Sequence, residues 1–192
     1  MKVLSIIQMI INALVKPKQR ILIQKIPEGR VLDIGGGGEG VIAQAGGAMV
    51  VAIDKCISEI HEARENATTT PWMVADGTEL PYKNNSFDNA TAFFSCMYMT
   101  DDLKEYVFKE TRRVLKKGGE FWIWDVRMAS NQVFAIRLNV DFSENHTIKT
   151  IYGVKAKDQS DVSMCHLLHE AGFETEVIAN RKYWFFIKAK RV

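Results

Sequence analysis

The sequence has few of the features that mark exported, disulfide-bonded or membrane-spanning chains. It holds three cysteines in 192 residues, none of them in a CxxC pair, and an odd count cannot complete a disulfide framework. Its longest apolar run, residues 1–15, is shorter than the ~20 residues that cross a bilayer. KPKQR follows this run in place of a cleavage site for an export signal. These absences predict a cytoplasmic protein without a transmembrane segment.

A strong charge of either sign is also missing. Lys and Arg total 25 and Asp and Glu total 23, which gives a net charge of +2. Such a small excess does not predict nucleic-acid binding, and the basic stretch 181–191 is expected to be a solvated sheet edge. Cys165 and His169 have a spacing that could supply two metal ligands on a helix, but no companion pair is evident. No metal site is predicted.

The composition is that of one ordinary globular domain. Hydrophobic residues make up 47% and charged residues 25% of the chain, and the length fits a single domain. No internal repeat, low-complexity segment or linker divides the sequence. We therefore expect one domain over residues 1–192.

The N-terminus carries a helical pattern. Ser5, Gln8 and Asn12 are spaced by three and four residues, so they would share one face of an otherwise apolar helix. Pro17 would end this helix or open the next one, which would cover residues 18–25. Two N-terminal helices are expected within residues 1–26.

Short apolar runs alternate with amphipathic stretches in the middle of the chain. This alternation predicts a parallel sheet covered by helices on both faces. The expected strands are 31–34, 49–54, 72–76, 87–94 and 120–126, and the expected helices are 39–45, 57–66 and 101–115.

The C-terminal third of the sequence has a different hydrophobic pattern. Residues 133–142 alternate apolar and polar side chains, and 147–155 can return as the second arm of a β-hairpin. A helix over 160–171 should end at Gly172, before two antiparallel strands at 173–179 and 184–189. The expected fold is α/β and doubly wound, with a mostly parallel seven-stranded sheet, an antiparallel last strand, N-terminal helices and a hairpin insertion.

A glycine-rich turn follows the first strand of the alternating region. Gly35, Gly37 and Gly40 fit GxGxxG, the strand-to-helix turn that lets backbone approach a ligand closely. A phosphate loop of the Walker type is excluded, because Val41 and Ile42 stand where it needs Lys and Ser or Thr. The motif leaves a dinucleotide and S-adenosylmethionine as alternative ligands, beside a flexible turn that binds no ligand.

Asp54 ends the next strand, 19 residues after Gly35. A carboxylate at that position can accept hydrogen bonds from both hydroxyls of a ribose. Because both alternatives contain a ribose, Asp54 predicts a nucleoside ligand without choosing between them.

Residues 28–126 resemble the class I, Rossmann-like S-adenosylmethionine-dependent methyltransferases. The motifs that carry the resemblance are VLDIGGGGEG (31–40), VVAIDK (50–55), VADGTELPYKNNSFD (74–88) and SFDNATAFFS (86–95) followed by RVLKKGGEFWIWD (113–125). The resemblance implies roles for Asp33 at the methionine end of the cofactor, Asp54 at the ribose and Asp76 at the adenine. The cofactor-binding set that it implies is Asp33, Gly35, Gly37, Asp54, Lys55, Asp76, Gly77 and Ser95.

One position departs from the family's pattern. Glu39 stands where the family usually has the last glycine of its first motif, and the third glycine is displaced to Gly40. We therefore expect a slightly larger loop. The resemblance favours methyl transfer from S-adenosylmethionine to a small molecule, leaving S-adenosylhomocysteine. An NAD(P)-dependent oxidoreductase and a non-catalytic S-adenosylmethionine-binding module remain as alternatives.

No catalytic residue is assigned from the sequence. Tyr98, Asp101, Asp125 and Arg127 are expected near the carboxyl ends of the strands, in structural or substrate-orienting roles. Two added segments could cover the acceptor there, the apolar N-terminal helix and the hairpin at 133–155. The helix could instead pack on the sheet, pair with a second copy in a homodimer, or contact a membrane surface.

Overall fold

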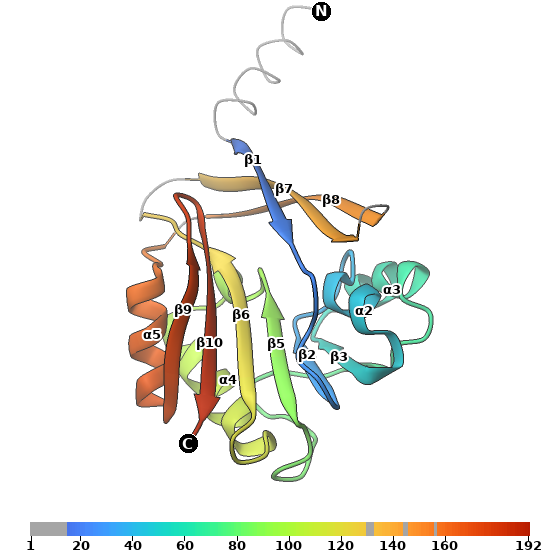
Figure 1. The fold of residues 1–192 in the computed structure, drawn as a ribbon, viewed down its shortest axis with the longest axis vertical. Coiled ribbons are helices and arrows are strands. Elements are labelled where there is room, and N and C mark those ends of the chain that lie inside the picture. The colour runs from blue at the N-terminus through green and yellow to red at the C-terminus, as the bar shows by residue number, and fades with distance from the viewer. Residues whose placement is uncertain (1–14, 130–132, 144–145, 156) are drawn as a thin grey trace, which may run out of the picture.

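The computed structural model describes residues 15–129, 133–143, 146–155 and 157–192, and its centre is a seven-stranded sheet (Figure 1). The strand order is β4-β3-β2-β5-β6-β10-β9, and β10 runs antiparallel to both of its neighbours. The α/β class expected from the sequence is confirmed. The strands of this sheet are β2 (Val31–Ile34), β3 (Val50–Asp54), β4 (Trp72–Val74), β5 (Asn89–Phe93), β6 (Glu120–Val126), β9 (Phe173–Asn180) and β10 (Trp184–Arg191).

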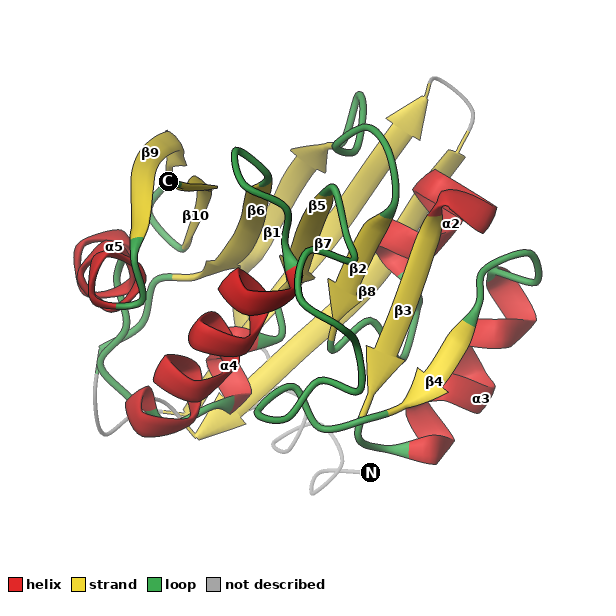
Figure 2. Ribbon diagram, turned by 90° about the horizontal axis from the view of Figure 1, so that it is seen from below, coloured by secondary structure: helices red, strands yellow, loops and turns green. Residues whose placement is uncertain are grey.

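Helices connect these strands. They are α2 (Val41–Gly46), α3 (Ile57–Asn66), α4 (Asp101–Val114) and α5 (Asp161–Glu170), with short 3-10 turns η1 (Gly47–Met49) and η2 (Cys96–Tyr98). Ser160 caps α5 by accepting a hydrogen bond from the Ser163 amide at 3.1 Å. In Figure 2, α4 and α5 lie side by side. Within the described ranges, no helix is both long and apolar enough to cross a membrane.

The large sheet separates two apolar clusters, because successive side chains of a strand point to opposite faces. In β6, Phe121 and Ile123 pack with side chains of α4 and α5. Trp122 and Trp124 of the same strand belong to the other cluster, which also includes Ile42 of α2. Both faces of the strands in the middle of the sheet are therefore buried.

A second sheet has the order β1-β7-β8 and is built from β1 (Val15–Leu22), β7 (Val133–Ser143) and β8 (His146–Lys155). β1 is parallel to β7, and β7 is antiparallel to β8. Figure 1 shows this sheet lying across the end of the large sheet to which the arrows of β5 and β6 point. It therefore covers the carboxyl edge, where ligands bind in open α/β sheets.

The helix expected over residues 18–25 is wrong, because β1 occupies this segment through Leu22. Ile21 and Ile23 are buried, whereas Leu22 between them is exposed. This alternation fits a strand, and hydrogen bonds to β7 outweigh the local helical propensity. Pro17, which has no N–H to donate, lies at a shift in the β1–β7 register. The helix expected over residues 1–15, and the lid or homodimer contact suggested for it, fall outside the described residues except for Val15, which belongs to β1.

Candidate functional site

The glycine-rich loop lies between β2 and α2, against the ends of β3 and β5. The amides of Gly35 and Gly36 donate to the carbonyl of Ile53 at 2.9 and 3.0 Å. Gly35 has a φ of +69°, and a Cβ there would lie 2.6 Å from the Cβ of Ser95. Both the conformation and the space therefore require glycine at this position.

Asp54, the last residue of β3, holds this loop. Its Oδ2 accepts a hydrogen bond from the Gly37 amide at 3.2 Å, and its Oδ1 accepts one from the Cys56 amide at 2.9 Å. A Cβ on Gly37 would lie 2.8 Å from Asp54 Oδ2 and 2.5 Å from the Cβ of Glu59. Each carboxylate oxygen has two lone pairs, so the half-buried Asp54 can still accept hydrogen bonds from the hydroxyls of a ribose.

Asp33 lies buried beneath the loop. The hydroxyl of Thr91 donates to its Oδ1 at 2.7 Å, and a Cβ on Gly36 would clash with its Oδ2. Burial raises the pKa of Asp33 to about 7, against the lowering effect of the Thr91 hydrogen bond, and the charge of Asp54 adds to the rise. A cation placed beside the loop would favour the ionised form of Asp33.

Asp76 lies two residues beyond β4 and is exposed. Its Oδ1 accepts hydrogen bonds from the Thr78 amide at 2.9 Å and the Thr78 hydroxyl at 2.7 Å. These bonds lower its pKa, and the charge of the exposed Lys55 adds to the effect. Gly77 packs beside Ile34 and Val107.

Ser95 follows β5 by two residues, and its hydroxyl donates to the carbonyl of Ile34 at 2.8 Å. All eight residues of the expected cofactor-binding set thus lie at or just beyond the carboxyl ends of β2, β3, β4 and β5. These four strands are neighbours in the sheet. The structure therefore brings the set to one edge.

This edge carries a concentration of carboxylates. Besides Asp33 and Asp54, Glu39 lies within the glycine loop, and Glu59 Oε2 would lie 3.3 Å from a Cβ on Gly38. Burial and the charges of Glu62, Asp54 and Glu39 raise the pKa of Glu59. Such a site suits a nucleoside that carries positive charge. The residues present fit S-adenosylmethionine, whose sulfonium and amino groups are cationic.

The other acidic and basic candidates have structural partners. Asp125 is buried in β6, which raises its pKa to about 6, and it accepts hydrogen bonds from the Met97 amide at 3.1 Å and Gln159 Nε2 at 2.8 Å. Asp101 pairs with Lys104 at 2.9 Å.

Arg127 forms an ion pair with Asp161 at the start of α5 and donates to Asn180 of β9. Its guanidinium thus ties α5 and β9 to the end of β6. Tyr98, in η2, stays exposed beside the second sheet.

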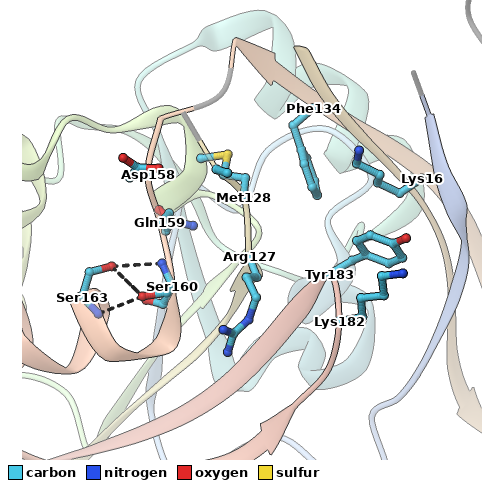
Figure 3. Close-up of a pocket in the computed structure, with 11 residues that line it drawn as sticks. Lys16, Arg127, Met128, Phe134, Asp158, Gln159, Ser160, Ser163, Lys182 and Tyr183 are labelled. Atoms are coloured by element: carbon cyan, nitrogen blue, oxygen red, sulfur yellow. Dashed lines mark hydrogen bonds between the residues drawn. The ribbon is translucent and has the colours of Figure 1, made fainter. Parts of the chain in front are cut away.

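A cavity of about 450 Å³ lies between the two sheets, beyond the end of β6 (Figure 3). Phe134 and Lys16 from the second sheet line it, together with Met128, Tyr183 and Lys182. None of the expected cofactor-binding residues contributes to its wall. It adjoins the carboxyl edge without overlapping the glycine loop.

Sequence reasoning missed two parts of this site. Thr91, the hydroxyl partner of Asp33, is a polar residue in the middle of a buried strand, and that pattern could have identified it. Glu39 was noted only as a departure from the glycine spacing. Its partners Thr150 and Tyr152 lie in β8, more than one hundred residues away along the chain, and no local pattern connects them to it.

Comparisons with known proteins agree with this geometry. A family described as "Methyltransferase domain" matches residues 32–123. The chain is 30% identical over 156 residues to the 27-O-demethylrifamycin SV methyltransferase of Amycolatopsis mediterranei, covering 77% of this chain and 54% of that protein. It is also 30% identical over 111 residues to a demethylmenaquinone methyltransferase of Mycobacterium sp. (strain KMS), covering 57% of this chain and 46% of that protein.

The chain spans about half the length of the curated relatives it matches. Among solved structures, a SAM-dependent methyltransferase from Methanosarcina mazei has a TM-score of 0.62 at 18% identity, covering 95% of this chain and 97% of that one. This similarity shows a shared fold. With the sequence match over residues 32–123 and the arrangement of the glycine loop, it agrees with the resemblance to the class I, Rossmann-like S-adenosylmethionine-dependent methyltransferases.

Proposed function

We propose that this protein transfers a methyl group from S-adenosylmethionine to a small-molecule acceptor. The observation that carries the proposal is the group of carboxylates around the glycine loop, Asp33, Glu39, Asp54 and Glu59. The negative charges of these carboxylates would stabilise a bound cationic nucleoside. The pyrophosphate of NAD(P) would meet Glu39 and Glu59 at the loop that has to hold it, so the oxidoreductase alternative is disfavoured.

Each residue of the proposed cofactor site has a distinct role. Asp54 binds the ribose hydroxyls, Asp76 accepts from the adenine amino group, and Asp33 lies under the methionine end. Gly35 and Gly37 let the loop backbone pack closely against Ser95, Asp54 and Glu59, which holds the loop in place for the cofactor. Lys55, Gly77 and Ser95 support these groups through charge, packing and the hydrogen bond to Ile34.

The reaction then depends on how the chain holds its two substrates. When bound, S-adenosylmethionine supplies a methyl group already activated by its positively charged sulfur. The chain's contribution is to place an acceptor atom about 3–3.5 Å from that methyl group and to exclude water. The hairpin β7–β8, which lies over the carboxyl edge, is the proposed acceptor cap. Asp125 and Arg127 remain structural.

Several features support a small molecule as the partner. The names of two relatives specify a demethylrifamycin and a demethylmenaquinone as acceptors. The near-balanced net charge does not favour nucleic-acid binding. The free cysteines Cys56, Cys96 and Cys165 suit the reducing cytoplasm that we propose as the location. The apolar cluster shared by both sheets supports a single domain.

Calorimetry tests the cofactor. Wild-type protein should bind S-adenosylhomocysteine and should not bind NADH. Asp54→Ala should weaken S-adenosylhomocysteine binding by about 1.5–3 kcal/mol, since it removes hydrogen bonds to a charged acceptor. Asp102→Ala, which removes an exposed carboxylate in the first turn of α4, should leave the affinity unchanged.

Binding of NADH in preference to S-adenosylhomocysteine would refute the proposal. Methyl transfer separates an enzyme from a non-catalytic binding module. Protein incubated with methyl-labelled S-adenosylmethionine and an unbiased metabolite extract should label a small molecule. Cofactor binding without any labelled product would favour the module.

A further inference from the structure

Glu39 joins the glycine loop to the second sheet. Its Oε1 accepts a hydrogen bond from the Thr150 hydroxyl, and its Oε2 accepts one from the Tyr152 hydroxyl at 3.4 Å. Thr150 and Tyr152 are two residues apart in β8, so their side chains share one face of the strand. A single carboxylate therefore holds two side chains of the hairpin.

The loop end of this contact is fixed to the cofactor site. Gln44 Nε2 of α2 donates to the Glu39 carbonyl at 2.6 Å. One residue before Glu39, the Gly38 amide donates to the carbonyl of Glu59 at 2.9 Å. Two residues before it, the Gly37 amide donates to Asp54 Oδ2. A displacement of Glu39 would therefore reach the carboxylate proposed to bind the ribose.

The hairpin end is fixed as well. Thr150 is buried, and the ring of Tyr152 stacks on Phe94 with centroids 5.3 Å apart and planes 7° apart. Burial, and then the charge of Glu39, raise the pKa of Tyr152 well above its ordinary value, so its hydroxyl keeps the proton that it donates. Phe94 directly precedes Ser95 of the cofactor site.

We infer that Glu39, Thr150 and Tyr152 form a clasp through which the hairpin positions the glycine loop for the cofactor. The inference rests on the proposed function. It also accounts for the departure from the family's glycine spacing, because the position of the missing glycine supplies the carboxylate. Gly40 instead adopts the left-handed conformation at the turn into α2, with a φ of +62°.

Coupling between two sites is reciprocal. If the hairpin stabilises the loop conformation that binds cofactor, bound cofactor must stabilise the hairpin by the same factor. Glu39 is thus a positioning residue, and Thr150 should affect cofactor affinity from outside the proposed cofactor-binding set.

Calorimetry with S-adenosylhomocysteine tests the clasp. Thr150→Val removes the hydroxyl with little change of shape and should weaken binding about five- to tenfold, a typical coupling. Glu39→Ala should weaken binding to a similar extent. The double variant should bind no more weakly than the weaker-binding single variant, because both changes break the same contact.

Two further variants separate the clasp from a general effect on the hairpin. Thr150→Ser keeps the hydroxyl and should keep wild-type affinity. Thr147→Val removes a hydroxyl from the same strand, one that donates to Asp141 within the second sheet at 2.6 Å, and it should also leave the affinity unchanged. Amide hydrogen exchange in β8 should slow when S-adenosylhomocysteine is added to wild type, and this slowing should be lost in Thr150→Val.

The inference is overturned if Thr150→Val binds S-adenosylhomocysteine as wild type does, or if the effects of Thr150→Val and Glu39→Ala multiply. If Thr150→Val fails to fold, amide hydrogen exchange in β8 of the wild-type protein tests the clasp instead. Exchange that does not change when S-adenosylhomocysteine is added would refute the clasp. A wild-type protein that binds no S-adenosylhomocysteine refutes the proposed function itself, so the two failures are distinguishable.

Discussion

At the scale of single residues, the site is dominated by carboxyl groups whose surroundings differ. Asp33 is buried with one hydroxyl partner, Asp54 is held by two backbone amides, and Asp76 is exposed beside Thr78. Burial opposes ionisation, whereas amide and hydroxyl donors favour it. The three acids are therefore suited to different contacts, although all three lie at the carboxyl edge of the large sheet.

Asp33 predicts a pH dependence of stability. Its pKa is about 7 in the folded protein against an ordinary value of 3.8, so between these values the folded state binds a proton that the unfolded state has lost. The contribution of Asp33 to the free energy of unfolding therefore falls as pH rises from about 4 to about 7. Asp33→Asn does not titrate, and its amide oxygen can still accept from Thr91.

Urea denaturation at pH 5 and pH 8 measures this effect. The free energy of unfolding of Asp33→Asn, relative to wild type, should rise between the two values by an amount on the order of a few kcal/mol. Titration of Asp125 occurs in both proteins and cancels in the comparison. A difference between variant and wild type that is the same at both pH values would contradict the assignment.

At the scale of elements, the glycine loop acts as a unit set between β2, β3 and α3. Its amides donate to Ile53, Asp54 and Glu59, so the loop has little freedom to move away from β3. An added Cβ at Gly35, Gly36 or Gly37 would lie 2.4–2.6 Å from a neighbouring side chain, so only glycine fits at these three positions. A substitution in this loop therefore tests whether close packing of the backbone, rather than a need for flexibility, requires glycine there.

Gly37→Ala should disrupt this approach. The added Cβ would lie 2.5 Å from the Cβ of Glu59 and 2.8 Å from Asp54 Oδ2, so α3 or Asp54 has to shift. We expect destabilisation of about 1–3 kcal/mol and at least a roughly tenfold loss of S-adenosylhomocysteine affinity. Calorimetry and urea denaturation measure both quantities.

Gly118→Ala provides the comparison. Gly118 has a φ of +81° and no atom within 4 Å of an added Cβ, so this change costs about 1–2 kcal/mol of stability through backbone strain alone. Its affinity for S-adenosylhomocysteine should remain that of wild type. Equal losses of affinity in both variants would mean that stability, and not the fit of the loop, controls binding.

At the scale of the whole molecule, the two sheets share one apolar cluster. Ile21 of β1 and Leu138 of β7 pack in the same cluster as Phe93 and Trp124 of the large sheet. A shared interior couples the stability of the second sheet to that of the large sheet. The second sheet should therefore not unfold as a separate unit.

Ile21→Ala tests this coupling. Ile21 is 2% exposed and Leu22 is 59% exposed, so the neighbouring change Leu22→Ala is a matched control. Ile21→Ala should destabilise the protein by about 2–5 kcal/mol through the cavity it creates, whereas Leu22→Ala should stay within about 0.5 kcal/mol of wild type. Tryptophan fluorescence and far-ultraviolet circular dichroism should report one coincident unfolding transition. Two separated transitions would show that the second sheet folds independently.

The sequence by itself determined the features that short-range patterns encode. Strand β6 has the bounds expected from its apolar run, 120–126. The glycine turn after β2 and the acid at the end of β3 lie where their motifs place them, because periodicity and turn chemistry act over a few residues. The position of both motifs at the carboxyl edge of the sheet is also predictable, because parallel strands end on the same side.

Only the tertiary structure decided which distant segments meet. The segment around Ile21 has a sequence compatible with a helix, and it is a strand because β7, more than one hundred residues later, offers unpaired backbone groups and a buried face. Glu39 likewise acquires its partners Thr150 and Tyr152 only when β8 lies over the glycine loop. Backbone pairing and buried hydrogen bonds between remote residues leave no periodic trace in a single sequence, so these contacts could be found only in the folded chain.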